Sequence, residues 1–378
     1  MRSVIVSRGC ALSRLRFAFI SALVLIVPSL SAADTIPVQL TDDTFWRLVN
    51  DYSEQSGSFR FEYMSNEQQF QYVIPRLKEN RKPGGVYLGV GPEQNFTYIA
   101  ALQPKMAFIF DIRRQNMVEH LMYKAVFELS PTRAEFLSRL FSRNTPTGLT
   151  DKTPVRVLFQ LYRTSSPNAA LYQRNLQAIK DQLTKVHKFQ LSTEDLNSLE
   201  YIYRVFFEAG NAFSYNAFPA SGFGGGASYA DLMSATDEAG LPRSYLANEE
   251  NFQIVRDLHK KNLIVPVVGD FAGGKALRKV GQYIREHGAT VTAFYTSNVE
   301  QYLFQQDDDW RKFLTNVATF PLDGASMFIR SSHFTYGDLP QSINRSRFYQ
   351  LLSPMSEVTK AFNEGKITDY EDVIRMSK

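Results

Sequence analysis

The sequence predicts an α/β protein built on a doubly wound, mostly parallel, Rossmann-like sheet that carries a helical insertion. Residues 85–91 and 106–111 are short segments with apolar side chains on both faces, as in strands buried in a parallel sheet. Two more apolar segments, residues 263–269 and 290–295, are separated by a helical pattern. Strands that alternate with helices favour a parallel sheet covered by helices.

The first 33 residues predict a secretory signal peptide. They hold four arginines, no acidic residue, an apolar run over residues 17–30 and small side chains at 31–33. The run has 14 residues and contains Pro28, which is shorter than the roughly 18 to 20 residues of a membrane-spanning helix. The single cysteine, Cys10, precedes this run, so the sequence does not support lipid attachment, and a cleaved chain would have no disulfide. We therefore expect an exported protein, periplasmic or secreted, that contacts the membrane only through its leader.

The charge of the chain argues against a nucleic-acid partner. The formal net charge is +4, and the leader accounts for all of it, which leaves 38 basic and 38 acidic residues in the remainder. A basic patch that binds nucleic acid would need an excess outside the leader.

Residues 34–378 are expected to form one domain. Residues 34–81 are predicted to be helix and loop, with a helix that starts at Ser65-Asn66-Glu67. The two strands at 85–91 and 106–111 follow. A mainly helical insertion is expected at about 115–225, because apolar residues recur there at three- and four-residue spacing.

The rest of the chain returns to the sheet. A third strand is expected around Tyr229–Met233, followed by a helix from about 248 to 260 and the strand at 263–269. A helix at about 275–287 then leads to the strand at 290–295. Ligands of such sheets bind beyond the carboxyl ends of the strands, so a binding site is expected at that edge.

The strongest motif combines glycines after the first strand with a carboxylate after the second. Gly89 and Gly91 end the first strand, and Asp111 ends the next one, 20 residues beyond Gly91. Glycines let a ligand approach the backbone, and a carboxylate at a strand tip can accept hydrogen bonds from ribose hydroxyls. A dinucleotide site would need a third glycine where Gln94 stands, and Glu93 would repel a pyrophosphate. The alternative is a tight turn with Asp111 as a helix cap.

Four strings of the sequence resemble a bacterial family of exported proteins with a class I S-adenosylmethionine-dependent methyltransferase-like fold and no assigned reaction. The strings are residues 84–97, 110–116, 228–237 and 265–273. The resemblance implies S-adenosylmethionine or a related nucleoside as a possible ligand. Gly89, Gly91 and Asp111 match the cofactor loop and the ribose-binding acid, while Asp237 and Asp270 would follow the third and fourth strands. The chain departs from the pattern in two ways, since Val86 or Tyr87 replaces the usual first-strand acid and no Asn-Pro-Pro-Tyr element follows the fourth strand.

The candidate residues for such a site come from these strand ends. Asp270 and Ser297-Asn298 are expected on the wall opposite Asp111, and Arg113 and Asn116 are expected either to line the pocket or to cap the next helix. The candidate binding residues are Gly89, Gly91, Glu93, Asp111, Arg113, Asn116, Asp237, Asp270, Phe271, Ser297 and Asn298.

Two other kinds of site find little support. Residues 269–275 satisfy the G-x-x-x-x-G-K part of a phosphate-binding loop, but Ala276 replaces the Ser or Thr that holds magnesium, and Asp270 would face the phosphates. The five histidines are scattered, so no metal site is expected.

Three functions fit these observations. The first is an exported protein that binds a nucleoside-type or other small polar ligand at the strand carboxyl ends. The second is an active methyltransferase, against which export counts because S-adenosylmethionine is made in the cytoplasm. The third is a non-catalytic envelope interaction protein. The sequence assigns no catalytic residue, so enzymatic activity stays open.

Overall fold

The fold is organised by one open sheet of six strands in the order β3-β2-β1-β4-β5-β6. The computed structural model describes residues 1, 3–4, 35–59, 63–79, 84–215, 227–332 and 349–377. The leader predicted at residues 1–33 therefore lies almost wholly outside the described residues. The strands are β1 (Val86–Val90), β2 (Met106–Asp111), β3 (Ile264–Val268), β4 (Val291–Ser297), β5 (Met327–Ser332) and β6 (Tyr349–Pro354).

Every neighbouring pair of strands is parallel except β5 and β6, which pair antiparallel. The chain runs from β1 outward to β2 and β3, and then crosses back to place β4 on the other side of β1. This is the strand order of a doubly wound Rossmann-like sheet, with a switch point between β1 and β4. The predicted mostly parallel α/β architecture is thus confirmed.

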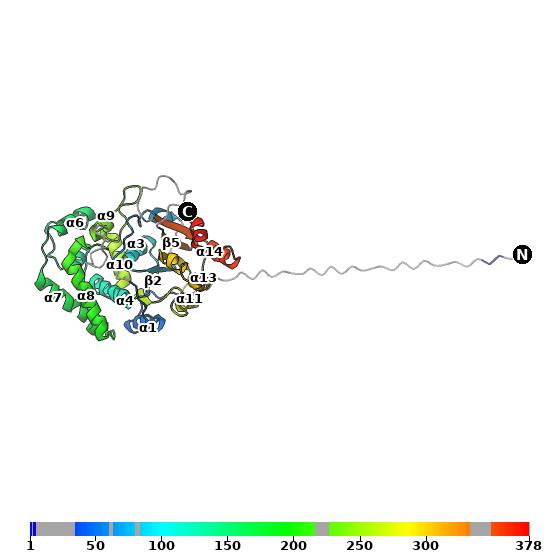
Figure 1. Ribbon diagram of the computed structural model, residues 1–378, viewed down its shortest axis with the longest axis horizontal. Coiled ribbons are helices and arrows are strands. Elements are labelled where there is room, and N and C mark those ends of the chain that lie inside the picture. Colours follow the sequence, from blue (N-terminus) through cyan, green and yellow to red (C-terminus); the bar gives the residue numbers. More distant parts are fainter. Residues whose placement is uncertain are drawn as a thin grey trace. The chain divides into compact units, whose positions relative to one another are not determined.

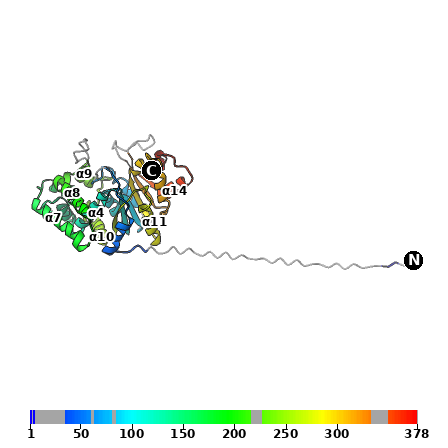
Figure 2. The ribbon, with the colours of Figure 1, turned by 60° about the horizontal axis from the view of Figure 1, so that its bottom comes forward.

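Helices cover both faces of the sheet. Phe294 and Tyr295 are consecutive in β4 and point to opposite faces, since the ring of Phe294 lies 6.1 Å from that of Phe313, and the ring of Tyr295 lies 5.2 Å from that of Tyr98. Figures 1 and 2 show α4 and α10 on one side of the strands and α11 on the other. The helices that build these layers are α1 (Asp42–Tyr52), α3 (Gln94–Leu102), α4 (Arg114–Glu128), α10 (Glu249–Lys260), α11 (Ala276–Glu286) and α13 (Asp309–Val317).

Between β2 and β3 the described chain forms helices and no strand. After α4 come α5 (Arg133–Phe141), α6 (Val155–Arg163), α7 (Ala169–Asp181), the π-helix Gln182–Val186, α8 (Thr193–Ala209), the 3-10 helix Gly210–Ala212 and α9 (Tyr229–Ser234). The remaining helices are α2 (Ile74–Glu79), α12 (Val299–Leu303), α14 (Met355–Asn363) and α15 (Tyr370–Arg375). In Figure 1, α6 to α9 lie together at the side of α4 and α10. Contacts divide the chain into Met1–Ala32 and Ala33–Lys378, and all these elements belong to the second unit.

One predicted strand is wrong. Residues 229–233 form α9 because Ser228 and Asp231 make a capping box, in which the Ser228 hydroxyl accepts from the Asp231 N–H and the Asp231 carboxylate accepts from the Ser228 N–H. The strand at 263–269 is consequently the third of the sheet and pairs with β2. The helix expected from Ser65 begins only at Ile74, because residues 68–73 form turns.

Strands β5 and β6 complete the sheet beyond the predicted ones. No helix in the described part of the chain is long and apolar enough to cross a membrane.

Candidate functional site

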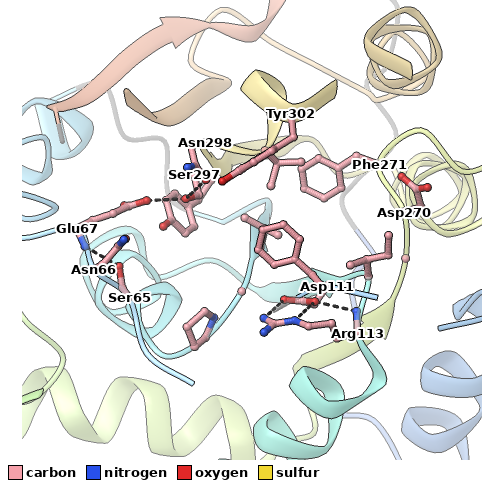
Figure 3. A pocket seen from close by; sticks show the side chains of 18 of the residues that line it. Ser65, Asn66, Glu67, Asp111, Arg113, Asp270, Phe271, Ser297, Asn298 and Tyr302 are labelled. Atoms are coloured by element: carbon pink, nitrogen blue, oxygen red, sulfur yellow. Dashed lines mark hydrogen bonds and ion pairs between the residues drawn. The ribbon is translucent and has the colours of Figure 1, made fainter. Parts of the chain in front are cut away.

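A pocket opens at the carboxyl ends of β1 to β4, where the strand order reverses (Figure 3). It has a volume of about 270 Å³, close to the lower end of the roughly 300 to 1,000 Å³ of typical ligand pockets. Its walls combine apolar side chains, among them Met64, Phe271 and Val299, with three carboxylates at Glu67, Asp111 and Asp270. This composition suits a small ligand with an apolar body and several polar groups.

The pocket gathers most of the candidate residues, though not all. Seven line it, namely Gly91, Asp111, Arg113, Asp270, Phe271, Ser297 and Asn298. The other four, Gly89, Glu93, Asn116 and Asp237, do not belong to its lining.

The two glycines serve different purposes. A Cβ at Gly89 would lie 1.8 Å from the side-chain oxygen of Asn95, so this glycine makes room for Asn95 and not for a ligand. The Asn95 amide in turn donates to the carbonyl oxygens of Val90 and Pro92 at 2.9 and 2.7 Å. Gly91 lines the pocket with φ of +76°, a left-handed conformation that glycine adopts without strain. The turn after β1 is therefore held by the Asn95 side chain, and its backbone at Gly91 faces the pocket.

Asp111 forms a bidentate ion pair with Arg113. Its Oδ1 accepts from the backbone N–H and from Nε of Arg113, both at 2.8 Å, and its Oδ2 accepts from Nη2 at 2.7 Å. Both side chains are buried, and Figure 3 shows them side by side at the pocket wall. A carboxylate has about four acceptor positions, so about one is left for a ligand. Asp111 therefore has room for one hydroxyl donor, and not for the several ribose hydroxyls that the sequence analysis allowed.

Glu93 lies beneath the turn and not beside a ligand. The side chain is fully buried, and this burial raises the pKa of Glu93 to about 8. At neutral pH the group is therefore mostly uncharged, and it does not repel an anion as the sequence suggested. Burial also raises the pKa of the neighbouring Glu119, on α4. Asn116 is buried on the same helix and lies outside the pocket lining.

Asp237 is held in a turn after α9. It accepts from Arg243 Nε at 2.8 Å and from the Leu241 N–H at 2.9 Å. The expected place after a third strand does not exist, because α9 replaces that strand. Asp237 thus fixes a turn in the helical region.

The loop that resembles a phosphate-binding loop is filled by a carboxylate of the chain itself. Glu54 Oε2 accepts from the Asp270 N–H at 3.0 Å, and Glu54 Oε1 accepts from the Lys275 and Ala276 N–H groups at 2.7 and 2.8 Å. Backbone N–H groups arranged in this way form an anion-binding concavity. Glu54 takes the place that a phosphate would take, which is a structural reason against a nucleotide phosphate at this loop.

The sequence analysis missed the pocket residues that precede α2. Phe59, Met64, Ser65, Asn66 and Glu67 line the pocket, and Figure 3 shows Ser65, Asn66 and Glu67 on the side away from Asp111 and Asp270. No local sequence pattern predicts that these residues line a pocket, because tertiary contacts place this segment over the strand ends. Ser65 and Glu67 carry a signal only for a turn, since the Ser65 hydroxyl accepts from the Glu67 N–H at 3.1 Å.

Glu67 is the centre of a buried polar network. Its Oε2 accepts from Gln94 Nε2 at 2.6 Å and from Gln350 Nε2 at 2.8 Å, and its Oε1 accepts from Ser297 Oγ at 2.5 Å. Burial raises the pKa of Glu67, although these hydrogen bonds act in the opposite direction. In the hydrogen bonds described, every donor to the Glu67 carboxylate is an uncharged amide or hydroxyl group. The Asp111 carboxylate, by contrast, accepts from the charged guanidinium of Arg113.

Two aromatic side chains stand at the rim of the pocket. The rings of Phe59 and Tyr302, which both line the pocket, meet edge to face with centroids 5.6 Å apart. Both are more than a third exposed. Among the described residues, no group of three or more His, Asp, Glu or Cys side chains could hold a metal ion.

A comparison of the sequence with models of protein families assigns the chain to one family. The family described as Domain of unknown function (DUF7790) matches residues 63–195 and 226–377, and the chain belongs to this family. The two matched ranges contain β1 to β6 and every candidate residue. No curated protein matches the sequence.

Proposed function

We propose that this member of the DUF7790 family is exported and binds a nucleoside-type or other small polar ligand in the pocket at the strand carboxyl ends. The observation that carries the proposal is the convergence of Asp111, the last residue of β2, with Asp270 and Phe271, after β3, on one pocket. Parallel strands of a Rossmann-like sheet present their ligands at this edge.

The ligand class rests on the methyltransferase-like resemblance together with the chemistry of the pocket. Asp111 retains about one acceptor position, which suits a single ribose hydroxyl. Phe271 lines the pocket and is itself supported by a stacked Phe313, with ring centroids 5.3 Å apart. A flat heterocyclic base packs well against such rigid aromatic surfaces. S-adenosylmethionine and related nucleosides are therefore the first ligands to test.

Calorimetric titration of the purified protein with S-adenosylmethionine, S-adenosylhomocysteine and adenosine tests the proposal. We expect Asp111→Asn to weaken binding about tenfold to a hundredfold, since a charge-assisted hydrogen bond contributes roughly 1.5 to 3 kcal/mol. Asp257→Asn is the matched control, because Asp257 is an exposed carboxylate on α10 outside the pocket. Absence of binding heat for all three compounds at millimolar concentration would overturn the nucleoside proposal.

A further inference from the structure

The turn between β4 and α12 holds a serine in an unusual backbone conformation. Ser297 ends β4 with φ of +51°, and Asn298 leads directly into α12. Of the five described non-glycine residues with positive φ, Ser297 is the one that lines the pocket. Such strained positions are uncommon outside glycine and gather at functional sites.

The surrounding contacts fix this turn. The pairing of β4 with β5 shifts register between Tyr295 and Ser297, so the regular ladder is interrupted directly before the turn. Thr296 Oγ1 donates to Glu300 Oε2 at 3.1 Å, and Glu300 is bound in turn by the buried Arg330. A serine on a sharp strand-to-helix turn, with its hydroxyl directed into a pocket, has the placement of an enzymatic nucleophile.

The hydroxyl of Ser297 is paired with a base. Ser297 Oγ donates to Glu67 Oε1 at 2.5 Å, and Figure 3 shows the two side chains meeting at the end of the pocket away from Asp111. Gln94 and Gln350 hold the other carboxylate oxygen. A nucleophile in contact with a base that is itself oriented by a third group is the arrangement of covalent catalysis.

We propose that Ser297 and Glu67 form a nucleophile–base pair that hydrolyses small carboxylic esters in this pocket. The inference goes beyond the proposed ligand binding and does not depend on it. The apolar walls at Met64, Val299 and Leu303 suit a short apolar acyl group. The only co-reactant is water.

Each step balances. Ser297 Oγ attacks the ester carbonyl carbon while its proton passes to Glu67, and collapse of the tetrahedral intermediate expels the alcohol, which takes that proton. Water then attacks the acyl-enzyme and gives a proton to Glu67, the carboxylic acid departs, and the proton returns to Ser297. The side-chain amide of Asn298 lines the same pocket with its Oδ1 3.5 Å from Ser297 Oγ, and its NH2 group is the donor that we assign to the oxyanion.

Burial supports the role of Glu67 as a base, because it raises the pKa of this carboxyl and so strengthens its affinity for the serine proton. Gln94 is a positioning residue whose hydrogen bond favours the ionised form. Gln94→Met should therefore move the acidic limb of the pH–rate profile to higher pH, whereas a merely structural role would leave the limb in place. The titratable groups facing Glu67 are Glu93, Tyr87, Tyr98 and Tyr295.

The test combines covalent labelling with ester hydrolysis. The purified protein is treated with a fluorophosphonate probe and mapped by peptide mass spectrometry, and hydrolysis of p-nitrophenyl acetate and butyrate is followed by absorbance. We expect the adduct on Ser297, and hydrolysis rates at least about 100-fold lower for Ser297→Gly and Glu67→Gln. Glycine keeps the left-handed turn without strain, so Ser297→Gly removes the hydroxyl while preserving the fold. Ser56→Ala, at an exposed serine outside the pocket lining, is the control and should behave as wild type.

Each outcome decides between the two proposals. No adduct on Ser297, or equal hydrolysis by wild type and a folded Ser297→Gly protein, overturns the esterase inference. Calorimetric binding of a nucleoside in that case leaves the proposed function standing. Labelling of Ser297 and ester hydrolysis without nucleoside binding would support the esterase inference and overturn the nucleoside proposal.

Discussion

The buried ion pair behind the pocket provides a sharp test of what holds the site in place. Glu300, in the first turn of α12, accepts from Arg330 Nε and, at 3.1 Å, from Arg330 Nη2. The two side chains are 1% and 0% exposed, respectively. Glu300→Gln would leave the guanidinium charge buried without a counter-charge. Breaking one side of a buried pair costs about 3 to 5 kcal/mol, and since glutamine retains one acceptor we expect a loss of about 3 kcal/mol in the free energy of unfolding.

Urea denaturation followed by fluorescence and circular dichroism measures this loss as a shift in midpoint at an unchanged slope. Glu200→Gln is the matched control, because Glu200 pairs with Lys180 at 2.8 Å with half of its side chain exposed, and such surface pairs contribute below about 1 kcal/mol. The double variant Glu300→Gln, Arg330→Met should recover much of the stability, since it removes the uncompensated charge. A loss for Glu300→Gln no larger than that of the control, or a double variant no better than the single one, would refute the reasoning.

Three further predictions follow from charged groups elsewhere. Glu54→Gln should lower the free energy of unfolding by about 2 kcal/mol, because the carboxylate accepts from three backbone N–H groups. Urea denaturation measures this loss, with Asp51→Asn at an exposed carboxylate as the control. An equal loss of unfolding free energy in the two variants would contradict the prediction. Burial opposes protonation of His187, but its contacts with Glu128 and Asp42 raise its pKa overall. The stabilisation relative to His187→Gln should therefore be complete below about pH 6.5 and vanish as the pH rises through the raised pKa, so a constant difference between pH 5 and 9 would exclude this linkage. The free energy of unfolding of Glu93→Gln, relative to that of wild type, should rise by about 1.4 kcal/mol per pH unit between pH 4.5 and about 8, because folded Glu93 keeps a proton that the unfolded chain releases. Urea denaturation at pH 5 and at pH 7.5 measures this rise. The same difference between variant and wild type at both pH values would count against it.

The positions of the strand ends could be predicted from the sequence because buried parallel strands are short apolar runs with a polar residue directly after them. Asp111 is the last residue of β2, and Ser297-Asn298 follow the apolar core of β4. Since the carboxyl ends of parallel strands share one edge, such residues meet in one pocket without any knowledge of the loops. The failure at Tyr229–Met233 was local and avoidable, because the Ser228 and Asp231 spacing is a helix-capping signal.

The other half of the pocket depends on contacts between residues far apart in the sequence. Glu67 meets Ser297 across 230 positions, and Glu54 meets the Asp270 N–H across 216. The sequence of residues 269–275 argues against a bound phosphate, yet nothing local shows that Glu54 of the same chain accepts from the N–H groups of this loop. Single-sequence patterns identify the strands of a sheet, but they do not show which segment folds over the strand ends.

The pocket has two carboxylates in contrasting surroundings at its two ends, and this contrast suggests a division of labour. Asp111 is paired with the guanidinium of Arg113 and keeps about one acceptor position for a ligand. Glu67 is surrounded by neutral donors, and burial raises its pKa, which makes it a stronger base than an exposed glutamate. Groups whose surroundings differ in this way commonly take different roles in one site. A ligand that spans the pocket would be anchored at Asp111 and would react, if it carries an ester, at Ser297 beside Glu67.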